Sequence, residues 1–235
     1  MISKQRYSIL NNIIFIEPGF CNLLEKKIFF NINKVVFYNN EFLDFFNLHD
    51  DLNNFNIKKI LNINKSDSFG LNMFNEPIDN LFPSHITKIV FGHAFNQDVN
   101  NLPILLDTLF FGYNFNKTVD NLPSNLMCLI FSYSFNKCVE NLPNSIIYLV
   151  FGKNFNQPLY NLPNSVKYLN LIYTINFEYM NDLPDFIEHL VINDKNPNKL
   201  PEKNKIVECH YNYQYDILIQ TKFKFALNDI EFRIY

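Results

Sequence analysis

The stretch from Asn141 to Asn156, NLPNSIIYLVFGKNFN, contains the unit that much of this chain repeats. Its Phe-Asn pair recurs at Phe95-Asn96, Phe115-Asn116, Phe135-Asn136 and Phe155-Asn156. The differences 115 − 95, 135 − 115 and 155 − 135 all equal 20, and Asn-Leu-Pro recurs with the same step from residue 101 to residue 161. A fixed step of this size predicts a stack of short coils, in which equivalent residues of successive coils form continuous rows.

Within each copy the apolar residues follow one pattern, numbered from the first apolar residue after the Pro-x-Ser segment. Positions one, four and six are Ile86, Ile89, Phe91; Leu106, Leu109, Phe111; Leu126, Leu129, Phe131; Ile146, Leu149, Phe151; and Val166, Leu169, Leu171. Positions four and six alternate with position five, as expected for a strand that buries one face. Gly or Ser at position seven ends the strand, and the Phe at position ten is expected to fill the core.

The Asn that follows this Phe is expected to stabilise the bend of each coil. A buried side-chain amide both donates and accepts hydrogen bonds, so it can satisfy backbone groups that no regular structure pairs. We predict that these residues stack as a ladder along the array, each bonding to the backbone of the next coil. The ladder residues are Asn96, Asn116, Asn136 and Asn156.

The frame Leu-x-x-Leu-x-Phe-Gly-x-x-Phe-Asn resembles the leucine-rich repeat, with Phe in place of Leu at the third anchor. The endings Phe74-Asn75-Glu76-Pro77-Ile78 and Phe155-Asn156-Gln157-Pro158-Leu159, with Asn-Leu-Pro-x-Ser, more narrowly resemble the FNIP repeat. That family, found largely in amoebae and giant DNA viruses, implies a curved solenoid and protein binding, with no catalytic residues. Some members also carry an F-box, which implies a substrate receptor of a ubiquitin ligase.

We predict a single β-rich, leucine-rich-repeat-like solenoid over residues 1–235, with a parallel β-sheet on the concave face and about ten coils. Residues 1–65 are expected to form longer, atypical α/β repeats with short helices near Phe20–Ile28 and Glu41–Leu52, because their apolar residues keep helical spacing. FNIP-type repeats follow over 66–195 and a C-terminal cap over 196–235. A separate adaptor, such as an F-box, over residues 1–65 is the alternative.

Three coil assignments outside the central copies depend on weaker patterns. The first coil is expected to place Leu10, Ile13 and Phe15 at positions one, four and six, and a further coil is expected to begin at Ile57. The last coil is expected to place Ile206, Cys209 and Tyr211 at the same positions. The alternating runs 217–225 and 230–235 predict a hairpin or a paired edge segment.

Composition and charge limit the function classes. The formal net charge is −3 and Lys and Arg form no block, which argues against nucleic acid as a partner. No apolar run is long enough for a membrane helix, and the N-terminus lacks the apolar run of a signal peptide. The 4 Cys show no Cys-x-x-Cys spacing, which favours reduced thiols in an intracellular, cytoplasmic protein, or in the host cytoplasm if the gene is viral.

The sequence shows no arrangement typical of catalysis. No Gly-rich phosphate loop, nucleophile elbow or metalloprotease motif is present, and the chain has only 5 Gly. The residues that come nearest to a zinc-binding or acid–base group are His189, Glu208 and His210. We interpret them as solvated residues at the end of the array, where the repeat pattern weakens. We therefore predict no enzyme activity, no cofactor and no metal.

Position five should face away from the core, yet it is mostly apolar. Its central residues are Val90, Phe110, Ile130 and Val150, and His93, Tyr113, Tyr133 and Tyr173 lie beside them at position eight. An exposed apolar stripe flanked by tyrosines predicts a protein-binding surface on the concave face. Two alternatives remain: β-branched residues favour strands in any case, or the tail folds back over this face.

The predicted function is therefore a non-catalytic protein–protein interaction module of unknown partner and oligomeric state. The alternative is the substrate-recognition subunit of an F-box-type ubiquitin ligase, with adaptor contacts from the N-terminal segment.

Overall fold

A computed structural model describes residues 7–10, 12–16, 26–37, 73–171, 183–192, 206–209, 224–227 and 230–233. The regular elements of these residues are almost all short strands. They are β1 (Tyr7–Leu10), β2 (Ile13–Ile16), the 3₁₀ helix η1 (Lys26–Phe29), β3 (Lys34–Phe37), β4 (Lys88–Val90), β5 (Thr108–Phe110), β6 (Cys128–Ile130), β7 (Tyr148–Val150), β8 (Tyr168–Leu171), β9 (His189–Ile192), β10 (Ile206–Cys209), β11 (Lys224–Leu227) and β12 (Ile230–Arg233).

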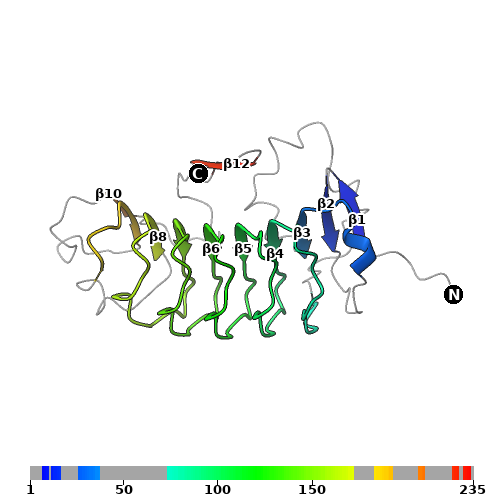
Figure 1. Cartoon of the computed structure of the whole chain (residues 1–235). Helices are drawn as coiled ribbons and strands as arrows, with labels where there is room; N and C mark the ends of the chain where they lie inside the picture. Colours follow the sequence, from blue (N-terminus) through cyan, green and yellow to red (C-terminus); the bar gives the residue numbers. More distant parts are fainter. Residues whose placement is uncertain are drawn as a thin grey trace, which may run out of the picture.

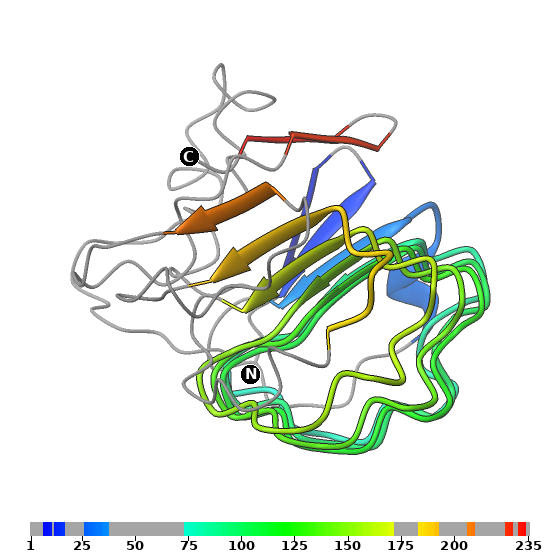
Figure 2. The ribbon, with the colours of Figure 1, turned by 90° about the vertical axis from the view of Figure 1, so that its left-hand side faces the viewer.

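Strands β1 to β10 form one sheet in chain order. Strand β1 pairs antiparallel with β2, and every later neighbour pairs in parallel. Figure 1 shows the strands along the concave side of a gently curved stack, and Figure 2 shows the coils superimposed when viewed along it. The predicted solenoid with a parallel sheet on its concave face is confirmed.

The core consists of apolar rows that run along the stack. Position four pairs Ile89 with Leu109, Leu109 with Leu129, and Leu129 with Leu149, all at most 1% exposed. Two columns of phenylalanine lie beside this row, one from position six and one from position ten. Ring centroids within a coil are 3.6–3.8 Å apart, and those of neighbouring coils are 5.5–5.7 Å apart in one column and 6.1–6.2 Å apart in the other.

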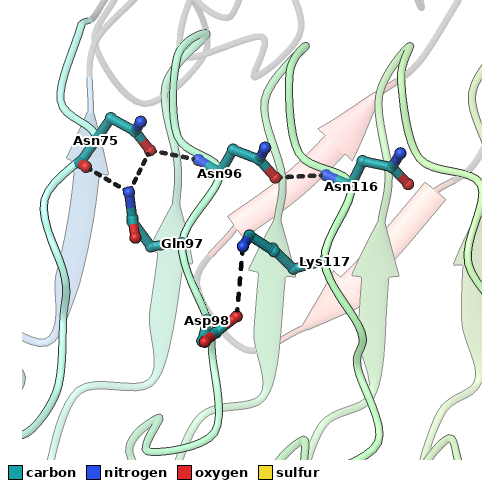
Figure 3. Close-up of polar contacts among 6 residues, drawn as sticks. All are labelled: Asn75, Asn96, Gln97, Asp98, Asn116 and Lys117. Carbon is teal, nitrogen blue, oxygen red and sulfur yellow. Dashed lines mark hydrogen bonds and ion pairs between the residues drawn. The ribbon is translucent and has the colours of Figure 1, made fainter.

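The predicted asparagine ladder is present and begins one coil earlier than predicted, at Asn75 (Figure 3). The backbone N–H of each ladder Asn donates to the Oδ1 of the equivalent Asn in the preceding coil. These N···O distances are 2.8 Å from Asn96 to Asn75, 2.9 Å from Asn116 to Asn96, 3.0 Å from Asn136 to Asn116 and 2.8 Å from Asn156 to Asn136. The side chains are half-buried or exposed rather than buried as expected, because they lie at the outer bend.

Further polar contacts at the outer bend also join neighbouring coils. Gln97 Nε2 donates to both Asn75 oxygens, and Lys117 Nζ lies 3.8 Å from Asp98 Oδ1 (Figure 3). A second row of side-chain bonds connects Asn101 to Asp79, Asn121 to Asn100 and Asn141 to Asp120. The coils are therefore held together on both the strand side and the bend side.

The predicted register of the first coil is wrong by one residue. Ile14 pairs with Val35, which pairs with Ile89, so Ile14 occupies position four and Phe15 position five. Leu10 belongs to β1, which forms an antiparallel hairpin with β2 and does not begin a coil. Asn12 in the turn between them has φ of 61°, a left-handed value that Asn tolerates better than most residues.

The coil predicted to begin at Ile57 has no place between β3 and β4, because these strands pair directly. Phe37 of β3 instead stacks on Phe74 at 4.5 Å, and Phe74 stacks on Phe95. Residues 73–85 therefore complete the coil that β3 begins. Phe91 and Phe95 are four residues apart whereas Phe37 and Phe74 are 37 apart, so this coil contains an insertion of 33 residues (37 − 4).

The predicted helices fall mainly outside the described residues. Of the range 20–28 the structure describes only 26–28, which belong to η1, and the range 41–52 lies outside the described part. Ile57 itself also lies outside it.

The C-terminal coil is shifted by two residues from its predicted register. Val207 pairs with Leu190 at position four and Cys209 pairs with Ile192 at position six. Beyond it, β11 and β12 form the predicted antiparallel hairpin as a separate two-stranded sheet. His189 and Glu208 are not register partners, because Ile206 pairs with His189 and Glu208 pairs with Val191 at position five.

Candidate binding surface

The concave face of the sheet consists of positions three and five, because successive residues of a strand point to opposite sides. We call Val90, Phe110, Ile130 and Val150 the concave stripe. These four residues lie apart from the main core cluster, as predicted, but they are only 3%, 2%, 3% and 7% exposed. The expectation that they form an open surface is wrong, because part of the chain covers this side of the sheet.

Position three shows a gradient of burial along the same face. Lys88, Thr108 and Cys128 are buried, whereas Tyr148, Tyr168 and His189 are half-buried. At position five, by contrast, Val150 of β7 and Asn170 of β8 are still buried. The cover therefore extends over β4 to β8 at position five, and at position three it ends after β6. In Figure 1 the hairpin β11–β12 lies above β5 and β6, and Figure 2 places it on the same side of the sheet.

The buried end of the position-three row contains an ion pair. Lys88 Nζ lies 3.4 Å from Asp107 Oδ1 and donates to Thr108 Oγ1, which in turn donates to Asp107. A buried ammonium needs such partners, because desolvation disfavours an unpaired charge. Burial raises the pKa of the neighbouring Cys128 thiol to about 12, opposed by Lys88. This thiol is protonated at neutral pH and is therefore a poor nucleophile.

The half-buried end of the row contains stacked rings. The centroids of Tyr148 and Tyr168 are 4.5 Å apart, and those of Tyr168 and His189 are 4.4 Å apart. Burial and the neighbouring Tyr168 raise the pKa of Tyr148. The sequence interpretation missed this row, although it follows from the same alternation that places position five on the concave face.

The predicted residues at position eight form a second ring stack, at the carboxyl ends of the strands. We call His93, Tyr113, Tyr133 and Lys153 the position-eight row. The centroids of His93 and Tyr113 are 4.7 Å apart, those of Tyr113 and Tyr133 are 4.4 Å apart, and Lys153 Nζ lies 5.5 Å from the centre of the Tyr133 ring. The rings are half-buried and Lys153 is exposed. Tyr173, predicted for the same surface, lies outside the described residues.

The backbone that carries the row is held by hydrogen bonds between neighbouring coils. The N–H of Asn114 donates to the His93 carbonyl, and the N–H of Ser134 donates to that of Tyr113, so the backbone is anchored beside each ring. Stacked aromatic side chains with one edge towards solvent offer apolar contact at a low cost in side-chain entropy. This is the type of surface that binds proteins.

Within the described ranges, no group of three or more His, Cys, Asp or Glu side chains is arranged to hold a metal ion. The described residues likewise include no helix long and apolar enough to cross a membrane.

The fold and the repeated bend together define a leucine-rich-repeat-like solenoid, a class of scaffold that generally binds proteins. Comparison with family models identifies residues 74–114 and 139–174 as FNIP repeats, which confirms the resemblance. A solved structure described as "CroV588 a novel circular LRR protein structure" is 35% identical, with a TM-score of 0.48, over 66% of this chain. This chain covers 24% of that protein's length. None of the curated proteins matches.

Proposed function

We propose that this chain is a non-catalytic recognition module that binds a protein partner through the position-eight row and the adjoining concave face. The observation that supports this proposal is the continuous stack from His93 to Lys153, with half-buried rings 4.4–4.7 Å apart. The array holds these rings in register without any large rearrangement, so little conformational entropy is lost on binding. The free thiols of Cys128 and Cys138 favour an intracellular location.

The chemistry of the row limits the partner. The stacked rings suit an apolar or aromatic segment, and the exposed ammonium of Lys153 at one end suits an acidic group on the same segment. We therefore propose a partner segment that combines apolar residues with a carboxylate. A receptor role in a ubiquitin ligase would be one use of such a surface. In that case an adaptor could not pair with the edges of β2 and β3, because these strands already pair with each other and with β4 in the sheet. The adaptor would have to contact another surface.

The test is affinity capture with matched surface variants. Tyr113→Ser combined with Tyr133→Ser removes the two central rings, and Tyr160→Ser removes a 56% exposed tyrosine from a different row. We expect partners that the wild type and Tyr160→Ser retain to be lost from the double variant, with circular dichroism unchanged. Equal capture by all three proteins would refute the proposal, and co-purified ligase subunits would identify the receptor role.

A further inference from the structure

The burial of the concave stripe needs a covering segment, and the C-terminal hairpin needs a surface to pack against. Val90, Phe110 and Ile130 project from the face of the sheet that is opposite the core, yet they are at most 3% exposed. Neighbours in the same flat row do not cover a side chain from above. The concave stripe must therefore have an occupant, and its buried residues extend from β4 to β7.

The hairpin in turn needs a surface. A two-stranded hairpin is at best marginally stable alone in water, and β11–β12 hydrogen-bonds only to itself among the described strands. Its register pairs Phe225 with Phe232 and Leu227 with Ile230, and it pairs Lys224 with Arg233. Paired residues share a face of an antiparallel ribbon. The register therefore places the four apolar residues at one set of alternate positions of the ribbon and the charged residues at the other set.

We propose that the β11–β12 hairpin of the same chain is the occupant of the concave stripe, and that it excludes other ligands from the stripe until it is displaced. Both views place the hairpin on this side of the sheet, above the strands where position three is buried. The role of the hairpin as a cover over a ligand-binding surface rests on the proposed function. The docking of the hairpin on the concave stripe does not depend on it.

The chain is long enough for this arrangement. Residues 210–223 connect β10 to β11, and an extended segment of this length spans about 50 Å at most. From β10 to β5 there are five strand spacings, which is about 24 Å. The hairpin can therefore reach β5 without strain in the connection.

The cover implies a displacement mechanism for a competing ligand. A ligand of the stripe would have to offer what the hairpin offers, namely an extended segment with alternating apolar and charged residues. Such a ligand would bind weakly while the hairpin is docked, because the docked hairpin reduces the fraction of binding-competent protein. The position-eight row lies outside the stripe at the strand ends and is half-buried, so it can be contacted before the hairpin leaves.

Cys128 is an internal probe for the cover, because it lies on the concave face at position three and is 3% exposed. The other cysteines, Cys21, Cys138 and Cys209, are first replaced by serine in the full-length chain. The rate of reaction of Cys128 with a disulfide reagent at pH 8 is then measured. Phe225→Ser with Phe232→Ser removes the paired apolar residues, and Lys224→Ser with Arg233→Ser is the matched control on the charged face.

We expect the apolar-face variant to react at least about tenfold faster, because both access and thiolate fraction increase, and the control to react at the starting rate. An unchanged rate in the apolar-face variant, or an equal increase in both, would overturn the proposal. Partner capture through Tyr113 and Tyr133 is a separate readout, so failure here leaves the proposed function testable.

A second measurement does not depend on how well the variants fold. A photoreactive phenylalanine analogue at position 232 of the full-length chain is irradiated, and the cross-linked peptides are identified by mass spectrometry. Cross-links within one chain to residues 88–130 would support the docking. Cross-links only to other parts of the chain, or only to a second copy, would overturn it.

Discussion

Asn136→Ala tests whether the asparagine ladder stabilises the array. Asn136 Oδ1 accepts the N–H of Asn156 at 2.8 Å and Nε2 of Gln157 at 3.0 Å, and alanine removes both bonds. At about 1 kcal/mol for each net hydrogen bond the loss is about 1–2 kcal/mol. We expect the lower half of this range, because Asn156 is exposed and water can replace the lost acceptor.

The assay for the ladder is urea unfolding followed by circular dichroism and by tyrosine fluorescence, since the chain has 13 Tyr and no Trp. The control is Asn154→Ala, which changes an exposed Asn of the next coil and keeps the bond from its backbone N–H to the Tyr133 carbonyl. A loss of about 1 kcal/mol corresponds to a fall of about 2–4 °C in Tm at this chain length. An Asn136→Ala protein as stable as the Asn154→Ala protein would refute the reasoning.

Three further predictions concern the core and the strand face. Phe135→Ala should lower the free energy of unfolding by about 3–5 kcal/mol, because the ring is fully buried between Phe115 and Phe155. As a control, Phe30→Ala changes a residue that is 79% exposed and should leave the urea midpoint unchanged. Gly112→Ala should lower Tm more than Ser132→Ala, because its new Cβ would lie 1.9 Å from the Gly92 carbonyl oxygen unless the coils separate. Cys128 has a folded-state pKa of about 12 against 9.0 as its ordinary value, so its contribution to stability is complete below pH 9 and is lost between pH 9 and 12. The free energy of unfolding of the wild type should thus fall by up to about 1.4 kcal/mol per pH unit relative to Cys128→Ala over that range; equal pH dependence of the two proteins would contradict the assignment.

The central array could be predicted because equal spacing fixes the register. Lys88, Thr108 and Cys128 are 20 residues apart, and they are register partners in β4, β5 and β6. Once each coil has the same length, a single strand assignment determines all the others. The same logic located the ladder, because any residue of the bend must lie beside its equivalent in the next coil.

The ends of the array could not be predicted in the same way. Ile13 to Ile16 are four consecutive apolar residues, so alternation fits either phase and only the pairing with Val35 decides it. Ile57 and Ile60 have the spacing of positions one and four, yet their segment falls within the insertion between Phe37 and Phe74. The sequence signal for this insertion was the pair Phe74-Asn75. It has the residues of a bend, but no strand of its own lies just before it in the sequence.

The concave stripe shows why a repeat pattern alone does not identify an open surface. Position five is apolar in successive coils, and local alternation is the same whether that face meets solvent, a partner or another part of the chain. The segment that best matches the stripe, with Phe225 and Phe232 paired on one face, lies about a hundred residues further along the chain. A row of apolar residues that faces away from the core therefore predicts that another segment covers the row, and does not predict that the row is exposed to solvent. The amphipathic hairpin of the tail is the segment of the described chain whose register suits that role.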